Sequence, residues 1–397
     1  MSKSYFLIIF CLISISNTFS QNLKRNGLFE LNCKLYSSSD LSTVYFSYEN
    51  YIGDQIQDSV NVKNNKFIVS GKIKYPTLIT LYKSKNFICS EKEFTDFYIE
   101  PNKMVFLIDP LQFSVIEFKG SQSQKDYDKL KNLKKMFFEN QKSFYKLGKE
   151  YYHKIQIEKD SLAISNLEQK LKDLAVLNNK NEQDELYINL KFAAENPKSF
   201  IVPDILSYTL DRDDKNISVN QIETILLAMD KSVKKSESSK KLIETVFFIK
   251  NSSVGSKAPN FDLKEIEGTI VSLKKFDGKC ILIDFWASWC SPCIEDFPFV
   301  KELFTTYKAK GLEVISLSYH DDIESWKKNI LKHGIQQFIN ISLEQNRTTL
   351  DRELHITSIP AKILISKKGI IIGRWFGKDE NFNIEISKMI ENELQQN

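Results

Sequence analysis

An apolar run that leads directly into a pair of cysteines constrains the fold of this chain more than any other feature. Residues 281–286 are apolar except for Asp284, which predicts a buried strand, and the sequence Cys-Ser-Pro-Cys follows at 290–293. At such a strand-to-helix junction, unpaired N–H groups and the positive end of the helix dipole stabilise a thiolate on the first cysteine. Pro292 fits the first turn of a helix, where its missing N–H has no partner. The pattern therefore indicates a redox-active pair of thiols at the start of a helix.

A zinc site is the main alternative for two cysteines at this spacing. Zinc sites in proteins normally have a second Cys or His pair, and here the remaining cysteines are isolated, at Cys11, Cys33, Cys89 and Cys280. The four histidines are scattered, without a partner at ligand spacing: His153, His320, His333 and His355. We therefore predict redox chemistry without a metal ion or cofactor. Two neighbouring core cysteines with no chemical role are the structural alternative.

Beyond the cysteines, apolar residues and turn signals alternate in the manner of an α/β fold. Phe297, Val300, Phe304 and Tyr307 have the spacing of one helix face packed on a sheet. The remaining predicted elements are strands at 312–319 and 338–343, helices at 323–333 and 383–394, and a hairpin over 361–377. Strands that alternate with helices imply a sheet covered on both faces.

Several separated motifs follow one another in order from residue 255 onward. They are the segments 255–263, 278–293, 358–361 and 363–365, together with Gly268, Pro298 and Gly369. These motifs resemble the TlpA/ResA-like branch of the thioredoxin-fold proteins. The resemblance covers residues 255–397 and implies an α/β thioredoxin-like domain that exchanges thiols and disulfides. It does not identify a substrate.

The two cysteines of the motif have different expected roles. Cys290 is the predicted nucleophile: it should be the more exposed thiol, with a pKa lowered from about 8.5 into the range of about 3.5–7.5. Cys293, one turn into the helix, should be buried and should resolve the mixed disulfide that Cys290 forms.

Two aspartates near the cysteines are candidates for proton transfer and for tuning the thiols. Asp284 interrupts an apolar strand, and a buried carboxylate costs several kcal/mol unless it is paired or protonated; an edge position that faces water is the alternative. By resemblance, Asp284 lies beneath the disulfide and exchanges a proton with Cys293, a role that a raised pKa would suit. Asp296 lies three residues after Cys293, on the same helix side. ResA-like members carry a glutamate there that tunes the cysteine pair, and a first-turn acid favoured by the helix dipole is the alternative.

Three further residues are expected to form the substrate side of the site. The resemblance implies that Pro360 is a cis-proline facing the disulfide and that the backbone of Ile359 pairs with the substrate chain. An X–Pro bond is the one at which a cis form costs little, and an ordinary trans-proline at a strand start is the alternative. Trp289, with Trp286, is predicted to flank the site as an apolar wall, although core packing alone explains Trp286 equally well.

Residues 1–20 have the pattern of a cleavable signal peptide. Lys3 precedes a compact apolar stretch at 5–15, and the segment 18–20 offers small residues for cleavage before Gln21. The apolar stretch is short for a membrane span, and an uncleaved anchor is the alternative. We therefore expect export to the periplasm or cell envelope, where disulfides form readily.

The rest of the chain is predicted to form a small antiparallel β-sandwich at 21–121 and a helical region at 122–250. The segments 70–73, 98–101 and 119–121 give a loose resemblance to an uncharacterised β-rich domain found ahead of TlpA-like modules. Alternation around Cys33 places it on a buried strand face, and we favour a core thiol there over a disulfide with Cys89. The helical region is either a spacer or dimer-forming arm, or a layer packed on its own chain.

These features lead to one principal hypothesis and two alternatives. The principal hypothesis is an exported thiol–disulfide oxidoreductase acting on envelope proteins, which by resemblance works in the reducing direction with a membrane electron donor. A peroxiredoxin-like peroxidase is the second, although Ala287 stands where that chemistry needs Thr or Ser. The third is a non-catalytic binding or scaffold protein. A net charge of +4, from 55 basic and 51 acidic residues without a concentrated basic patch, argues against a nucleic-acid partner.

Overall fold

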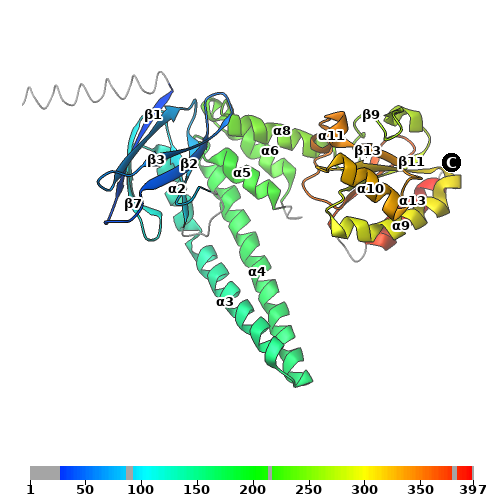
Figure 1. The fold of residues 1–397 in the computed structure, drawn as a ribbon, viewed down its shortest axis with the longest axis horizontal. Helices are drawn as coiled ribbons and strands as arrows, with labels where there is room; N and C mark the ends of the chain where they lie inside the picture. The colour runs from blue at the N-terminus through cyan, green and yellow to red at the C-terminus, as the bar shows by residue number, and fades with distance from the viewer. Residues whose placement is uncertain (1–26, 86–92, 213–216, 378–381, 396–397) are drawn as a thin grey trace, which may run out of the picture. The chain divides into compact units, whose positions relative to one another are not determined.

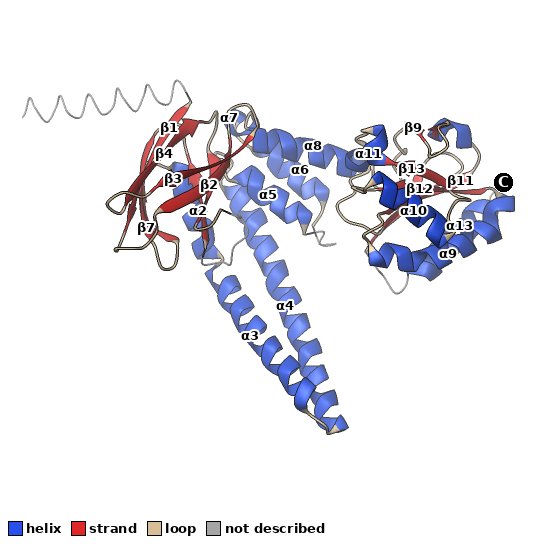
Figure 2. Cartoon of the chain, viewed as in Figure 1, coloured by secondary structure: helices blue, strands red, loops and turns tan. Residues whose placement is uncertain are grey.

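The computed structural model describes residues 27–85, 93–212, 217–377 and 382–395 (Figures 1 and 2). The expected signal peptide and Cys89 lie outside the described residues. The chain divides into two compact units, Met1–Leu242 and Ile243–Asn397. The β-rich region and most of the helical region belong to the first unit, and the α/β domain belongs to the second.

Within the described residues, the strands of the first unit form a β-sandwich (Figure 2). One sheet has the order β4-β1-β7-β8 and the other the order β3-β2-β5-β6. The strand bounds are β1 (Leu28–Leu35), β2 (Thr43–Glu49), β3 (Gln55–Asn61), β4 (Lys66–Lys72), β5 (Thr77–Tyr82), β6 (Phe94–Ile99), β7 (Lys103–Asp109) and β8 (Ser114–Lys119). Phe29, Leu31 and Cys33 alternate with more exposed residues and point into the core between the sheets, as their spacing predicts.

One strand pairing corrects the predicted antiparallel sandwich. Strands β1 and β7 run parallel, with Cys33 opposite Phe106. Parallel neighbours need a long crossover connection, and here the chain forms β2 to β6 between them, mostly in the other sheet. Cys33 is a free and buried thiol, and burial raises its pKa far above the ordinary value. The prediction of a core thiol at this position is therefore confirmed.

The helices of the middle region partly cover the sandwich and partly form a long pair. Their bounds are α2 (Gln122–Leu133), α3 (Lys135–Ile157), α4 (Ser161–Glu195), α5 (Val202–Asp211), α6 (Val219–Ala228), α7 (Lys231–Lys234) and α8 (Glu237–Asn251). Helix α2 is joined to β6 because the backbone N–H of Tyr98 donates to Gln124 at 2.8 Å, and the hydroxyl of Tyr98 donates to Asp204 of α5 at 2.7 Å. Helices α3 and α4 lie side by side (Figure 1). In the part of the chain described, no helix is both long and apolar enough to cross a membrane.

The second unit is built on a sheet of strand order β13-β12-β11-β14-β15. The bounds are β11 (Cys280–Trp286), β12 (Leu312–Ser318), β13 (Ile339–Ser342), β14 (Ala361–Ile365) and β15 (Ile371–Phe376), and β9 (Asp262–Lys264) pairs with β10 (Ile270–Ser272) in a separate hairpin. Central strand β11 runs parallel to β12 and antiparallel to β14. It is buried along its whole length, which explains its nearly continuous apolar sequence.

Apolar clusters cover both faces of this sheet. Cys280, Leu282 and Trp286 of β11 lie in a cluster with α9, α10 and α13, and Ile281 and Ile283 lie in a second cluster on the other face. The helix bounds are α9 (Ser291–Tyr307), α10 (Ile323–His333), α11 (Leu343–Asn346), α12 (Leu350–Glu353) and α13 (Phe382–Gln395), with short 3₁₀ turns η1 (Leu273–Phe276) and η2 (Lys308–Lys310). The predicted α/β thioredoxin-like fold is confirmed, with α9 beginning just beyond the end of β11.

Candidate active site

A disulfide closes the first turn of α9. Cys290 and Cys293 are bonded, with their Cα atoms 5.3 Å apart. Cys290 is the N-cap of the helix, and its Sγ accepts a hydrogen bond from the backbone N–H of Cys293 at 3.3 Å. Pro292 lies in the first turn, where it removes no helical hydrogen bond. The first sulfur therefore occupies the position at which a helix start stabilises a thiolate.

The surface beside the disulfide is made by a tryptophan. Cys290 is 5% exposed and Cys293 1% exposed, so Cys290 is the more accessible of the two although both are largely covered. Trp289 is 60% exposed, and its indole N–H donates to the carbonyl of His320 at 3.0 Å. Trp286 is fully buried and donates to Ser316 at 2.7 Å. Trp289 thus lies at the surface, whereas Trp286 belongs to the core.

The peptide bond between Ile359 and Pro360 is cis, as the family resemblance implies. It lies immediately before β14, and the carbonyl of Pro360 accepts a hydrogen bond from Gly377 at 2.8 Å. Ile359 is half-buried and packs against the apolar cluster that contains both cysteines. This geometry is compatible with a role of Ile359 and Pro360 in substrate contact, which stays a prediction.

Asp284 is buried in the middle of β11 rather than at an edge. In the antiparallel register of β11 and β14 it lies opposite Lys362, whose Nζ is 3.3 Å from Oδ1 of Asp284. The same Nζ is 2.7 Å from Oδ2 of Asp296 on α9. Pairing therefore reduces the cost of burying the carboxylate, and the water-facing alternative for Asp284 is wrong.

Burial and the ion pairs act in opposite directions on these groups. Burial raises the pKa of Asp284 above its ordinary value, while the Lys362 ammonium partly opposes that rise. Burial alone would lower the pKa of Lys362, but Asp284 and Asp296 together raise it. Lys362 is therefore a cation at neutral pH, and the pKa of Asp284 lies above the ordinary value of an aspartate.

Two residues of the site were not identified from the sequence. Lys362 is the one charged residue of the apolar strand β14, and only the register with β11 reveals its partner. Asp321 is buried and accepts hydrogen bonds from the backbone N–H and the hydroxyl of Ser288, each at 2.6 Å. It fixes the loop between β11 and α9, which carries Trp289 and Cys290. The sequence signal that could have identified Asp321 was a polar residue shortly after the end of β12.

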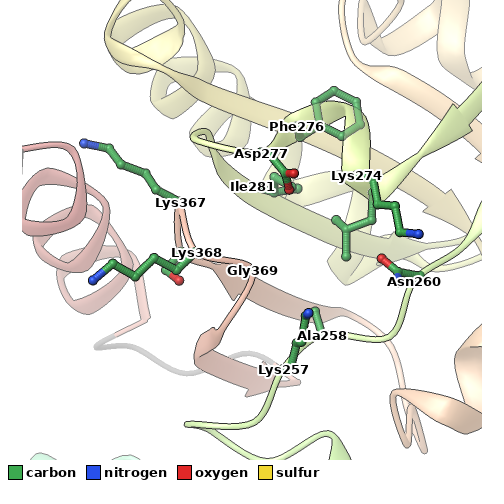
Figure 3. Close-up of a pocket in the computed structure, with 12 residues that line it drawn as sticks. Lys257, Ala258, Asn260, Lys274, Phe276, Asp277, Ile281, Lys367, Lys368 and Gly369 are labelled. Atoms are coloured by element: carbon green, nitrogen blue, oxygen red, sulfur yellow. The ribbon is translucent and has the colours of Figure 1, made fainter.

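The same unit contains a cavity of about 400 Å³ that neither cysteine lines (Figure 3). Ile281, at the start of β11, lines it together with Lys257, Lys274 and Lys368. The cysteines follow the opposite end of the same strand. Among the described side chains, no group of three or more His, Cys, Asp or Glu is arranged to hold a metal ion.

Comparisons with known proteins agree with this site. The family model of the AhpC/TSA family matches residues 254–374, and that of a domain of unknown function, DUF4369, matches residues 29–127. Thiol-disulfide oxidoreductase ResA from a strain of Bacillus cereus is 31% identical over 132 residues, covering 33% of this chain and 75% of that protein. The ResA protein of Geobacillus kaustophilus is 29% identical over 152 residues, covering 37% of this chain and 86% of that protein.

Solved structures show the same partial coverage. The thioredoxin domain of a thiol-disulfide oxidoreductase from Bacteroides vulgatus is 26% identical with a TM-score of 0.32, covering 35% of this chain and 98% of that one. The similarity to ResA spans three quarters of that enzyme, and the matched part of this chain holds the disulfide at the helix start and the cis-proline. With its thioredoxin-like second unit, this chain belongs to the ResA-like family of thiol-disulfide oxidoreductases.

Proposed function

We propose that this protein is exported and reduces disulfides in proteins of the periplasm or cell envelope through its Cys-Ser-Pro-Cys pair. The observation that carries the proposal is the disulfide at the start of α9, with Cys290 as the N-cap and the cis bond before Pro360 in the same unit. The family activity supports thiol–disulfide exchange. The direction, the compartment and the substrates are our proposals.

In the first step, the Cys290 thiolate attacks one sulfur of a substrate disulfide. A Cys290–substrate S–S bond forms, the substrate S–S bond breaks, and the second substrate sulfur leaves with the electron pair and takes a proton from water. The helix start favours this step because the N–H of Cys293 is directed at Sγ of Cys290. The covered position of the sulfur means that the substrate must approach along the surface beside Trp289.

In the second step, Cys293 resolves the mixed disulfide. Its thiol gives a proton to Asp284, its sulfur bonds to Sγ of Cys290, and the remaining substrate sulfur leaves as a thiolate. Two electrons pass from the cysteine pair to the substrate, and the enzyme ends in the disulfide form seen in the structure. Asp296, within reach of the same lysine as Asp284, tunes the pair.

A protein substrate would be held by backbone and apolar contacts. Trp289 presents a mostly exposed indole beside the disulfide, and Ile359 presents a half-buried side chain at the cis bond. We assign Trp289, Ile359 and Pro360 to substrate contact, with the backbone of Ile359 pairing with the extended substrate chain. Such pairing recognises the main chain and so tolerates many sequences.

Three further proposals concern the surroundings of the enzyme. A reductant must return two electrons after each cycle, and we propose a membrane electron donor for this role. Export rests on the signal-peptide pattern of residues 1–20. A homodimer through α3 and α4 is favoured by apolar side chains there that are strongly exposed, among them Tyr145, Tyr152 and Leu162; sedimentation analysis of the full chain tests it.

Reduction of insulin by the full chain tests the proposed activity. Cys290→Ser should abolish reduction, whereas Cys293→Ser should form stable mixed disulfides that dithiothreitol releases. Mass spectrometry of adducts trapped in an envelope extract would then identify substrates. The absence of both insulin reduction and thiol-dependent adducts would reject the proposal, and an unprocessed N-terminus on protein recovered from cells would reject the cleaved signal peptide.

A further inference from the structure

Asp284 lies on the face of the sheet that carries the disulfide. Side chains alternate along a strand, and the neighbours of Asp284 on its own face are Leu282 and Trp286. Both belong to the apolar cluster that contains Cys290 and Cys293. The carboxyl group is therefore on the α9 side of β11, beneath the redox-active pair.

Lys362 and Asp296 reach the same place from two other elements. Lys362 and Leu364 are two residues apart on β14, so their side chains lie on the same face of the sheet. Leu364 belongs to the apolar cluster that contains both cysteines. Asp296 follows Cys293 by three positions on α9 and so lies on the same side of the helix. The side chains of Lys362 and Asp284 are each 3% exposed and that of Asp296 is 16% exposed. One ammonium thus joins two carboxylates largely out of contact with water.

Two aromatic residues also lie beside Lys362. Trp375 of β15 lies opposite it in the sheet, and the ring of Phe382 from α13 lies 5.1 Å from its Nζ. The carboxyl groups that act on it are those of Asp284 on β11 and Asp296 on α9. Among the described residues, Lys362 is the cation that lowers the pKa of Asp284 against the effect of burial.

We propose that Lys362 is a positioning residue for the resolving step, which holds Asp284 and Asp296 together beneath the cysteines and keeps Asp284 ionised to accept the proton of Cys293. The inference rests on the function proposed above. Two neighbouring carboxylates disfavour each other's ionised form, and an opposite charge within hydrogen-bond distance favours it. Lys362 is the group placed to supply that charge.

Lys362 acts through Asp284 and does not itself exchange a proton. During resolution the proton moves from Sγ of Cys293 to the Asp284 carboxylate, while Cys293 bonds to Cys290 and the bond from Cys290 to the substrate sulfur breaks. The departing sulfur takes the electron pair of the broken bond. Because its two partners favour the charged form, Lys362 stays an ammonium throughout.

The chromogenic disulfide DTNB separates the two steps in the reduced full chain. With DTNB below the protein concentration, the first thionitrobenzoate released reports attack by Cys290, and the second reports resolution by Cys293. Lys362→Met replaces the ammonium with an apolar chain of similar length. The acid limb is the part of the pH profile in which the rate of the second release falls as the pH is lowered. In Lys362→Met we expect this limb to move to higher pH by about one to three units. The rate of the second release should be regained at alkaline pH, and the first release should be retained.

Control variants separate charge from packing. Lys362→Arg keeps a cation and should leave the acid limb close to its parental position. Lys368→Met removes an equal charge from an exposed turn and should leave both rates unchanged. The double variant Cys290→Ser/Cys293→Ser measures how much thionitrobenzoate the other thiols of the chain release.

Each outcome decides whether Lys362 acts in the resolving step or forms only a structural ion pair. A second rate that falls equally at every pH in Lys362→Met, or one that does not change, would overturn the proposal and leave a structural ion pair. If that variant does not fold, Asp296→Asn decides instead: it removes a carboxylate that opposes ionisation of Asp284, so its acid limb should move to lower pH, and an unmoved limb overturns the proposal. Absence of the first release in the parental chain would reject the proposed function itself.

Discussion

Replacing Asp321 by alanine tests how the loop that carries Cys290 is held. The buried carboxylate accepts two bonds from Ser288, each at 2.6 Å, and a longer one of 3.3 Å from the hydroxyl of Ser318. Hydrogen bonds to charged groups contribute about 1.5–3 kcal/mol each, so the two short bonds correspond to a loss of about 3–6 kcal/mol. Because burying the carboxylate itself carries a cost that the variant avoids, we expect the free energy of unfolding to fall by about 3 kcal/mol.

Tryptophan fluorescence during urea unfolding measures this loss selectively. All four tryptophans of the chain lie in the second unit, so their emission reports on the unit that contains Asp321. Asp321→Asn keeps an acceptor for the backbone N–H of Ser288 without the charge and should lose about 1–2 kcal/mol. Asp277→Ala removes an exposed carboxylate from the same unit and should stay within about 0.5 kcal/mol of the parent.

Loosening the loop should also slow the attack by Cys290. Small displacements of a reacting group reduce rates steeply, up to about a hundredfold for a displacement near 1 Å. We therefore expect the first release from DTNB to slow by at least about tenfold in Asp321→Ala. A change in unfolding free energy no larger than that of Asp277→Ala, or an unchanged first release, would show that Asp321 does not hold this loop.

The remaining predictions concern the proton acceptor and the buried thiol. Asp284→Asn should slow the second DTNB release by about 10²- to 10⁴-fold near neutral pH, the contribution of a general base, and should leave the first release nearly unchanged. Because burial raises the pKa of Asp284, the parental second rate should fall as acid protonates this carboxyl, and that limb should be missing in the variant. The same sign applies to stability: Asp284 favours folding most below its ordinary pKa and loses that contribution as pH rises through its folded-state pKa, so comparing urea unfolding of parent and variant over pH should show this slope only in the parent. Burial raises the pKa of Cys280 to about 12, so iodoacetamide should modify Cys290 in the reduced folded protein and Cys280 only after unfolding, as peptide mapping would show.

Features encoded within one short segment were predictable from the sequence. The run 281–293 contains the buried strand, the helix start and both cysteines, so local patterns suffice to place the disulfide at the junction. Burial of Asp284 follows in the same way, because apolar neighbours on both sides leave its strand no face toward water. The cis bond before Pro360 was predicted from the family resemblance, since the residues around it permit either isomer.

Features that depend on strand pairing could not be predicted from the sequence. Lys362 and Asp284 are far apart in the chain, and a shift of the β11–β14 register by one residue would place them on opposite faces of the sheet. The parallel pairing of β1 and β7 depends likewise on how the chain crosses between sheets. A single charged residue in each of two otherwise apolar strands was a signal in favour of pairing, but only the register identifies the two as partners.

The buried charges are better explained by thiol chemistry than by stability. Replacing a buried ion pair with apolar side chains of similar volume is often neutral or stabilising, so a fold selected for stability alone gains little from Lys362, Asp284 and Asp296. Two carboxylates and one ammonium also leave an unbalanced negative charge in an apolar cluster when all three are ionised. That excess favours uptake of one proton, and the group best placed to supply it is the thiol of Cys293 on the same face. A proton acceptor beneath a resolving cysteine must be easily protonated yet ionised before the step, and this arrangement meets both requirements.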